Sequence, residues 1–196
     1  MVLPIFLYGT DVLRAKAKPV KELDDSIVKL VYDMFETMHK ANGIGLAANQ
    51  VGDLRRVIVI DISDVHENAE GEEESPLHPT SPDLPRTLVL INPEPLEAEG
   101  SWAMEEGCLS IPDVRAEVER TEKVRLRFRD ASFKETELTV DGLLARVILH
   151  ELDHLDGVLF TDRIRKARKS LLLPKLKKIK QGEIETSYAV ITANES

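Results

Sequence analysis

The sequence predicts an α+β fold in which mixed or antiparallel β-sheets surround a central helix. Strand-like segments gather in the middle of the chain, and amphipathic helical segments lie before and after them. One helix is expected in the N-terminal half, and a basic helix is expected near the C-terminal end. Because 196 residues suit one compact core and no internal repeat is visible, residues 1–196 are predicted to form a single domain.

The first predicted helix covers residues 24–41. Its apolar side chains recur at spacings of three and four residues, which is the pattern of one buried stripe on an amphipathic helix. Asp24 or Asp25 is the expected N-cap, and Asn42 with Gly43 ends the helix. The stripe consists of Ile27, Leu30, Val31, Met34, Phe35 and Met38.

The strands are predicted from β-branched runs and from period-two alternation. In the segment 123–129, for example, Val124, Leu126 and Phe128 alternate with arginines, as expected for a strand with one wet face. The predicted strands are residues 56–61, 87–92, 96–102, 114–120, 123–129 and 135–140.

Residues 62–86 interrupt this pattern. They contain five glutamates and little apolar content, so we predict an exposed, mobile acidic loop inserted between the first two strands. His66 and His78 lie in this loop without partner ligands at a useful spacing, and solvent-facing positions are expected for both.

Two further helices are predicted, at residues 142–156 and at residues 163–180, where Pro174 is expected to kink or restart the helix. Residues 163–180 hold nine Lys or Arg and no acid; since the net charge of the chain is −9, the remainder carries −18. Such asymmetry is typical either of a basic arm for a nucleic-acid partner or of a helix with a solvated charged face. Residues 163–196 are thus predicted to be a basic helix and a tail.

Targeting signals are not visible in the sequence. The start of the chain lacks the basic region and the cleavage site of a secretory signal, and no apolar run approaches the length of a membrane span. The single cysteine, Cys108, cannot form an internal disulfide and indicates a reducing compartment. We therefore expect a cytoplasmic protein with no membrane partner.

The most informative stretch is residues 150–154, which read HELDH. Residues four apart share one helix face, so His150 and His154 can bind one metal ion, while Glu151 lies close enough to contact a water molecule on that ion. The alternative is two histidines that are merely packed in a helix. Catalytic sites usually have three protein ligands and one open position, so a third ligand is needed.

The third ligand has more than one candidate. A downstream carboxylate, Glu183 or Glu185, would give a metallopeptidase that cleaves internal peptide bonds. Cys108, flanked by glycine and two acids, is poorly placed for a core and would complete a Cys-His-His site, since coordination deprotonates a thiol. A non-catalytic ribosome-binding module with a structural metal is a further alternative, although closed structural zinc sites usually have four protein ligands.

Three short motifs resemble those of the peptide deformylases. The form G-x-G-x-A-A-x-Q stands at residues 43–50, EGCLS at residues 106–110, and HExDHLxG at residues 150–157. They occur in the order of the family and at matching separations, and the similarity extends from about Tyr8 to about Ile164. The acidic loop looks like an insertion relative to short members of the family.

This resemblance implies a metal-dependent enzyme that removes the N-formyl group from the N-terminal formyl-methionine of newly synthesised polypeptides. Cys108, His150 and His154 would bind one divalent metal ion, and Glu151 would activate the water bound to it. The family implies Fe(II) as the physiological ion, with zinc, nickel or cobalt possible in a purified protein. The Cys-His-His ligand set by itself suits zinc.

The resemblance also assigns roles around the reacting carbonyl. The Gln50 side-chain amide and the Leu109 N–H would bind the oxyanion of the tetrahedral intermediate. Position 49, often proline in the family, is asparagine here, which changes the stiffness of the loop. A second group would contact the substrate. Its glycines permit close approach of the backbone, and its arginine would contact the peptide backbone. Its apolar members either surround the methionine side chain or belong to an ordinary core. This group is Gly43, Ile44, Gly45, Met104, Glu106, Gly107, Arg115, Leu143 and Val147.

The expected partners follow from this activity. N-formyl-methionyl nascent peptides are the expected substrates. An enzyme acting on them would benefit from residence near the ribosome, and the nine positive charges of residues 163–180 would bind rRNA phosphates. We therefore hypothesise ribosome contact through this segment.

Overall fold

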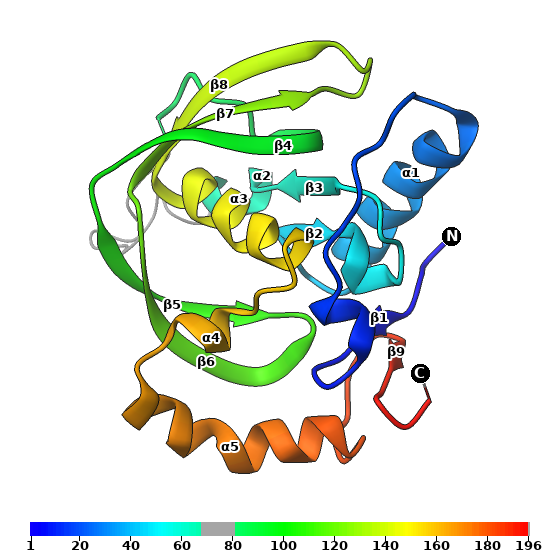
Figure 1. Cartoon of the computed structure of the whole chain (residues 1–196), viewed down its shortest axis with the longest axis vertical. Helices are drawn as coiled ribbons and strands as arrows, with labels where there is room; N and C mark the ends of the chain where they lie inside the picture. Colours follow the sequence, from blue (N-terminus) through cyan, green and yellow to red (C-terminus); the bar gives the residue numbers. More distant parts are fainter. Residues whose placement is uncertain (68–80, 196) are drawn as a thin grey trace.

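The protein is represented by a computed structural model that describes residues 1–67 and 81–195 (Figure 1). Its helices include two short 3₁₀ helices, labelled η1 and η2. In chain order the elements are β1 (Ile5–Phe6), η1 (Asp11–Arg14), α1 (Asp25–Lys40), β2 (Gly45–Ala47), η2 (Ala48–Val51), β3 (Val57–Asp61), α2 (Ser63–Glu67), β4 (Thr87–Glu99), β5 (Trp102–Cys108), β6 (Ile111–Arg120), β7 (Lys123–Arg129), β8 (Glu135–Asp141), α3 (Gly142–Leu155), α4 (Phe160–Arg163), α5 (Lys166–Lys180) and β9 (Val190–Ile191).

The predicted α+β class is confirmed. The described strands form a five-stranded sheet, the two-stranded hairpin β5–β6 and the pair β1–β9. Helix α3, which carries the HELDH stretch, lies between the five-stranded sheet and the hairpin (Figure 1). The predicted helix in the N-terminal half is α1, and the predicted basic helix is α5.

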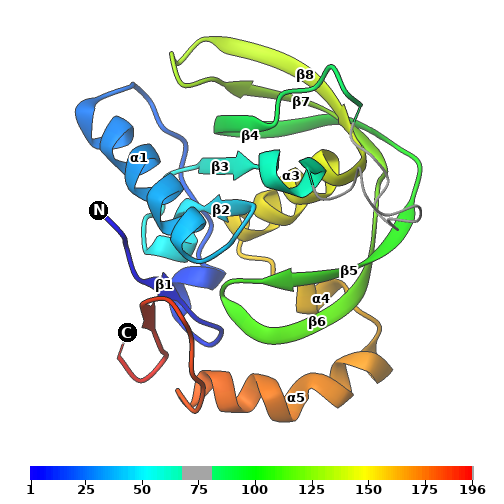
Figure 2. The same ribbon diagram turned by 180° about the vertical axis from the view of Figure 1, so that it is seen from behind.

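The five-stranded sheet has the order β2-β3-β4-β7-β8, and its neighbouring strands are all antiparallel. Side chains of β3 alternate between two helices, because successive residues of a strand point to opposite faces. Ile58 and Ile60 pack in the cluster that contains α3, whereas Val57 and Val59 pack with α1. The two helices therefore cover opposite faces of the sheet at its β2–β3 edge (Figure 2).

Helix α3 is enclosed on nearly all sides. Every residue except Leu149 is buried, and the buried set includes charged and histidine side chains as well as leucines. A buried polar group is costly unless it has a partner, so each of these side chains needs one nearby. Much of that partnership comes from the β5–β6 hairpin. The hairpin also packs on α4 and α5 through Val118, Phe160 and Leu176, among others.

The division of the central strands differs from the prediction. Residues 87–92 and 96–102 are predicted as separate strands, and this is wrong: β4 is one strand of 13 residues that runs through most of both. Its pairing with β7 shifts register twice between Ile91 and Glu97, so the prolines of this strand fall at irregularities, where a missing N–H donor is tolerated. Strand β5, which begins at Trp102, is not predicted from the sequence.

Other boundaries also shift. The loop predicted over residues 62–86 is wrong at its start, where α2 forms. Residues 68–80, which include His78, lie outside the described residues, as does the side chain of His66. The helix predicted over residues 163–180 begins later, because Arg163 ends the short helix α4 and α5 starts at Lys166; α5 contains Pro174 and does not restart there. Among the described helices, none combines the length and the apolarity that crossing a bilayer requires.

An ion pair ties η1 to α4. Arg14 contacts the Asp162 carboxylate at 2.5 Å and donates to the Gly157 carbonyl oxygen at 3.2 Å. Gly157 has a φ of 74°, and an added Cβ would collide with the Arg14 carbonyl, so a glycine is required there. Burial raises the pKa of Asp162, but hydrogen bonds from Arg14 and from the Leu159 N–H lower it by a larger amount, so the pKa falls to about 2.

This lowered pKa predicts that the Arg14–Asp162 ion pair stabilises the fold less at acid pH. The unfolded chain has an ordinary Asp162 pKa near 3.8, so the stabilising contribution is complete above about pH 4 and is lost as the pH falls towards 2. The Asp162→Asn variant should be less stable than wild type at pH 7, and the difference in free energy of unfolding should shrink between pH 4 and pH 2. Urea unfolding at several pH values measures it, with the exposed Glu22→Gln as control. A difference that stays constant down to pH 2 would contradict the assignment.

Candidate metal centre

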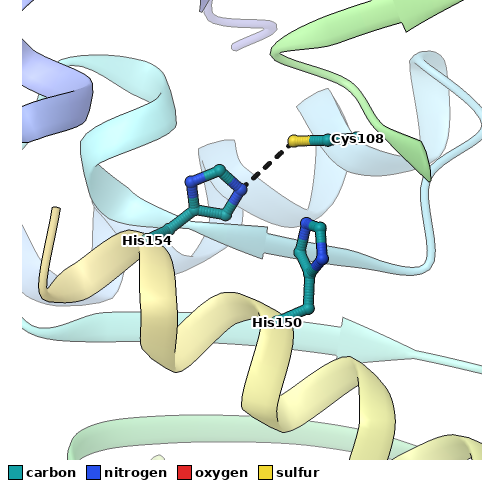
Figure 3. Close-up of side chains that lie close together, drawn as sticks. All are labelled: Cys108, His150 and His154. Carbon is teal, nitrogen blue, oxygen red and sulfur yellow. Dashed lines mark hydrogen bonds between the residues drawn. The ribbon is translucent and has the colours of Figure 1, made fainter. Parts of the chain in front are cut away.

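Two histidines and a cysteine meet at the centre of the molecule. His150 and His154 lie one turn apart on α3, and Cys108 approaches them from the end of β5 (Figure 3). One ligand atom from each of the three lies within 4.8 Å of the other two. The Cys108 Sγ is 3.1 Å from the His154 Nε2. Within the part of the chain that the structure describes, this is the group of His, Cys, Asp or Glu side chains that could hold a metal ion.

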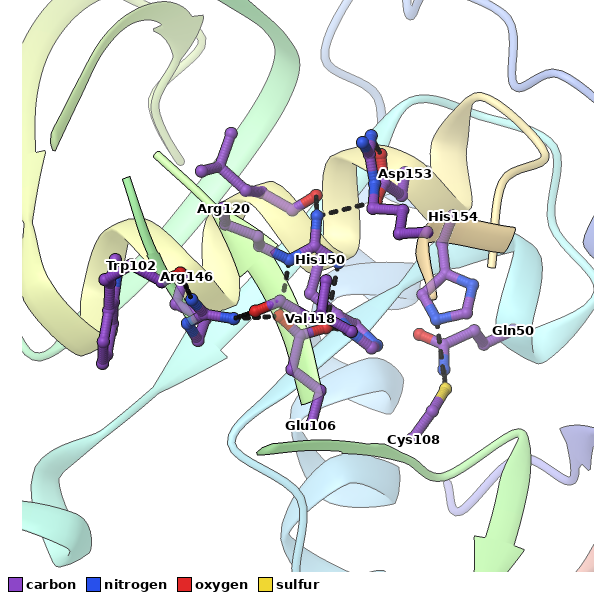
Figure 4. Close-up of polar contacts among 12 residues, drawn as sticks. Gln50, Trp102, Glu106, Cys108, Val118, Arg120, Arg146, His150, Asp153 and His154 are labelled. Atoms are coloured by element: carbon purple, nitrogen blue, oxygen red, sulfur yellow. Dashed lines mark hydrogen bonds and ion pairs between the residues drawn. The ribbon is translucent and has the colours of Figure 1, made fainter. Parts of the chain in front are cut away.

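Glu106 fixes the orientation of His150 (Figure 4). Its carboxylate lies 3.0 Å from the His150 Nδ1 and also accepts from Arg120 at 2.5 Å and from Arg146 at 2.6 Å. Burial raises the pKa of Glu106, but hydrogen bonds from His150 and Arg120 lower it by a larger amount, so the pKa falls to about 2. The carboxylate is therefore an anion that accepts from Nδ1–H, which leaves the lone pair of the His150 Nε2 free for a ligand.

The surroundings of His150 favour a cation. Burial lowers its pKa, but Cys108 and Glu106 raise it well above the ordinary value. A position that stabilises a proton on a buried imidazole stabilises positive charge in general, and a divalent ion would satisfy the same field. The pKa of His154 moves the other way: burial first, and then His150, lower it well below its ordinary value. A neutral imidazole is the form that binds metals. The three side chains thus fit a metal ion chemically.

Asn49 holds the second histidine from the side of η2. Its Nδ2 donates to the main-chain carbonyl of His154, at the end of α3, and the asparagine is fully buried. A proline at this position could not make that bond. Two buried atoms here, Asn49 Oδ1 and His154 Nδ1, have no hydrogen-bond partner among the described residues.

Arg120 extends the network to the far side of α3. It contacts the Asp153 carboxylate at 2.8 Å, and Arg163 binds the same carboxylate. Asp153 therefore pairs with two cations and lies outside the Cys-His-His group. Because Arg120 is 3% exposed and touches two buried acids, it joins β6 to α3 in a region that water does not screen.

Glu151 is buried, and one of its carboxyl oxygens lacks a hydrogen-bond partner among the described residues. This oxygen is Oε2, and burial raises the pKa of the carboxyl group to about 7. Gly45 lies against it: an added Cβ would stand 2.7 Å from the Glu151 Oε1 and equally close to Val147. Glycine at this position lets β2 approach the carboxyl group, which an ordinary side chain would displace.

Gln50 faces the same space from η2. Its Oε1 accepts from the Ala47 N–H at 2.8 Å, which directs its Nε2 towards Ser110 Oγ, at 3.2 Å, and Cys108 Sγ, at 3.6 Å. A fixed carbonyl oxygen leaves the amide N–H₂ as the group presented to Cys108, one of the candidate metal ligands (Figure 4).

A cavity of about 600 Å³ opens beside these groups. All nine residues expected to contact a substrate line it, together with Gln50, Leu109, His150 and Glu151. Glu106 is among the nine, yet its carboxylate is engaged by two arginines and a histidine. The nine are Gly43, Ile44, Gly45, Met104, Glu106, Gly107, Arg115, Leu143 and Val147.

The sequence does not predict several residues of this region. Arg120 follows the inward alternation of Val114, Ala116 and Val118 on β6, so a charged residue on an apolar face is a signal that could have found it. Tyr188 is half-buried, lines the cavity with its neighbours from the C-terminal tail, and donates to the Leu109 carbonyl at 2.8 Å. Burial raises its pKa to about 12, so the hydroxyl keeps its proton. No local pattern indicates this contact.

Comparisons with known proteins agree with the motifs. The family model described as "Polypeptide deformylase" matches residues 2–170. The chain is 46% identical to a peptide deformylase of Salinibacter ruber, over 100% of this chain and 97% of that protein. It is 45% identical to one from Chlorobaculum parvum, over 97% and 94% of the two chains.

Solved structures are similar as well. A peptide deformylase from Legionella pneumophila aligns with a TM-score of 0.77 and 36% identity, covering 93% of this chain and 98% of that one. A peptide deformylase from Thermus thermophilus aligns with a TM-score of 0.76 and 36% identity, covering 90% and 96%.

The buried charge network predicts a large effect of removing Arg120. The Arg120→Met variant leaves Glu106 and Asp153 with fewer counter-charges in a site that excludes water, so the free energy of unfolding should fall by about 3 kcal/mol. The control is Arg125→Met, which breaks an exposed pair with Glu97 and should cost less than about 1 kcal/mol. Urea unfolding of the two variants compares them. Equal losses would show that the buried network adds nothing beyond a surface pair.

Proposed function

The chain belongs to the polypeptide deformylase family, and we propose that Cys108, His150 and His154 hold the metal ion with which this family works. Members of the family are metal-dependent hydrolases that remove the formyl group from the N-terminal formyl-methionine of newly synthesised polypeptides, and this chain is such an enzyme. The observation that carries the residue assignment is the close approach of a thiol and two imidazoles beside the cavity, which Cys108 and His150 line.

The ion supplies Lewis acidity when bound: it lowers the pKa of water towards about 7 and polarises a carbonyl. We propose Fe(II) as the physiological ion, on the strength of the family resemblance, with zinc, nickel or cobalt as substitutes in a purified protein. The ligand set of one thiolate and two imidazoles fits zinc also, so the choice among these ions rests on the resemblance.

Glu151 is the proposed acid–base. Its carboxylate takes a proton from the attacking water and later delivers it to the nitrogen of the departing amine. A pKa of about 7 supports both steps, because the group can then accept and donate a proton near neutral pH. The unpartnered Oε2 and the position of Glu151 on the cavity wall support contact with the reacting groups.

Gln50 and Leu109 are the proposed oxyanion donors. The anchored Oε1 of Gln50 supports this role for its Nε2, since a donor that is already oriented needs no reorganisation during the reaction. Leu109 directly follows Cys108 in the sequence, so its N–H belongs to the peptide bond next to the proposed cysteine ligand. One donor of this kind contributes about 3–4 kcal/mol in the transition state.

The cavity is proposed to bind the formyl-methionine end of the substrate. Ile44, Met104, Leu143 and Val147 give it apolar walls that suit a methionine side chain. The glycines of the first two motifs, Gly43, Gly45 and Gly107, line the cavity, and the Arg115 side chain lies beside Gly107. Glu106 supports the site by orienting His150, as its contacts indicate.

Neither alternative function gains support. An internal-bond metallopeptidase needs a downstream ligand, and among the described residues neither Glu183 nor Glu185 belongs to the candidate metal group. A structural zinc site usually has four protein ligands, and the group in the described part of the chain has three. A cavity beside an incomplete ligand set favours catalysis over a structural metal.

We propose ribosome contact through residues 163–180. Several of their basic side chains are exposed on α5, including Lys177 and Lys178, and Leu171 and Leu173 are 78% and 53% exposed. Phosphates would bind the cations in a salt-dependent way. An enzyme that acts on nascent chains meets its substrates in the cytoplasm, which supports the proposed cytoplasmic location. Residues 1–196 are proposed to act as one catalytic domain.

The acid–base role predicts the behaviour of Glu151→Gln. This change keeps the shape of the side chain and removes its proton transfer, so kcat for a formyl-Met tripeptide should fall by roughly 10²–10⁴-fold. Protein purified without oxygen is assayed for deformylation, and its metal content is measured alongside. Glu105→Gln, at another carboxylate of the cavity wall, should retain activity within about threefold. Full activity of a metal-loaded Glu151→Gln protein would rule out the role.

The ribosome proposal predicts the effect of replacing Lys177 and Lys178 by alanine. Deleting the whole segment is unsuitable, because Leu176 and Ile179 are buried and the tail beyond them lines the cavity. The double variant should co-sediment less with ribosomes at low salt, and the slope of log K against log salt should lose about two units of magnitude. A matched change of net charge, Arg125 and Arg127 to alanine on β7, should have a smaller effect. Equal losses from the two pairs would refute a specific contact.

A further inference from the structure

The C-terminal tail returns from α5 to lie beside β1 (Figures 1 and 2). Strand β9 pairs in parallel with β1, and the N–H groups of Ile5 and Leu7 donate to carbonyls of Ala189 and Ile191 at 2.9 Å. Ile5 and Leu7 are fully buried, so the tail is attached to the core of the protein. The residues just before β9 therefore have a defined position.

Those residues, 185–188, form part of the cavity wall. The Thr186 hydroxyl donates to the Tyr188 carbonyl at 2.8 Å, which closes a short turn and fixes the backbone at Tyr188. The tail is thus held on both sides of Tyr188, by this turn before it and by the strand pairing after it.

The Tyr188 side chain reaches the turn that follows Cys108. Its hydroxyl donates to the Leu109 carbonyl at 2.8 Å. The next residue, Ser110, is held independently: its carbonyl accepts from the Tyr8 N–H at 2.8 Å, and its hydroxyl lies 3.2 Å from the Gln50 Nε2. Two contacts thus fix Ser110, and the tyrosine hydroxyl is the one that fixes the Leu109 carbonyl.

Leu109 is a place where such an anchor matters. The pairing of β5 with β6 shifts register between Gly107 and Cys108, so the regular ladder does not set the backbone of the turn. The N–H and the carbonyl of Leu109 are joined through one Cα, and holding the carbonyl limits rotation about that Cα. With Ser110 also held, the fixed carbonyl narrows the φ and ψ that Leu109 can adopt, and therefore the directions open to its N–H.

We propose that Tyr188 is a positioning residue for deformylation: its hydroxyl holds the Leu109 carbonyl so that the Leu109 N–H points at the oxyanion. This inference rests on the proposed role of Leu109 in the reaction. Tyr188 acts through the main chain and needs no contact with the reacting atoms. Its effect belongs to the transition state, because the oxyanion develops only there.

The test is the Tyr188→Phe variant, which removes one oxygen atom and keeps the ring. Loss of a correctly aimed donor costs more than a general loosening of the cavity, so kcat for a formyl-Met tripeptide should fall about tenfold while KM changes less than about twofold. Thr186→Val, which loosens the turn before Tyr188, should lower kcat in the same way but by less. Tyr32→Phe, at a 69% exposed tyrosine of α1, is the control and should match wild type.

A readout independent of activity is hydrogen exchange of the backbone amides at residues 108–110, which should be faster in Tyr188→Phe than in wild type or Tyr32→Phe. Faster exchange with a selective fall in kcat supports the inference. Unchanged kcat, a change confined to KM, or loss of bound metal in the variant overturns it. If the wild type itself did not deformylate the peptide, the proposed function would fail, and unchanged exchange in Tyr188→Phe would separately refute the anchor.

Discussion

The Glu106 carboxylate, enclosed by Arg120, Arg146 and His150, is the interaction on which the rest of the site depends. Removing one carboxylate and two guanidinium groups from water is expensive, and attraction alone often fails to offset that expense. Here nearly every contact is also a hydrogen bond, and the pKa of about 2 shows that these bonds outweigh burial. The network joins β5, β6 and α3. Because Cys108 lies two residues beyond Glu106, locking Glu106 to the helix brings the thiol to the two histidines.

A second constraint is the lack of room around α3. The helix is enclosed by the sheet on one side and the hairpin on the other, so β2, which leads into η2 and Gln50, can approach Glu151 only where its side chains are small. Gly45 meets this requirement directly, since an added Cβ would displace the Glu151 carboxyl group. Gly43 does the same for Leu109. The two glycines of the first motif thus follow from the close approach of backbone to the Leu109 side chain and to the Glu151 carboxyl group.

Much of the fold follows from local pattern, and the failures have physical reasons. Helix α1 could be predicted because one of its faces is apolar, and α3 because most of its residues are apolar. Asp24 caps α1 by accepting from the Ile27 N–H, as its position indicates. Strand β4 could not, because prolines read as breaks unless the bulges that accommodate them are known. Motif residues of the cavity wall could be predicted from the sequence, whereas Met104, Arg115, Leu143 and Val147 are expected only from the family resemblance. Tyr188 could not be predicted, since its contact with Leu109 spans 79 positions and depends on a strand of two residues.

Glu151 and His154 of α3 each have a buried polar atom with no hydrogen-bond partner among the described residues. In most of a folded protein, buried polar atoms find partners, and local preferences agree with the global fold. Among the described residues, Glu151 Oε2 and His154 Nδ1 break this rule within one turn of α3. A fold selected only for stability would replace them with leucine. A substrate in the cavity would give the Glu151 Oε2 a partner, and a metal ion would complete the contacts of the thiol and the two imidazoles. Binding those groups would then stabilise the native state itself, because ligands that bind only the folded chain add their free energy to folding.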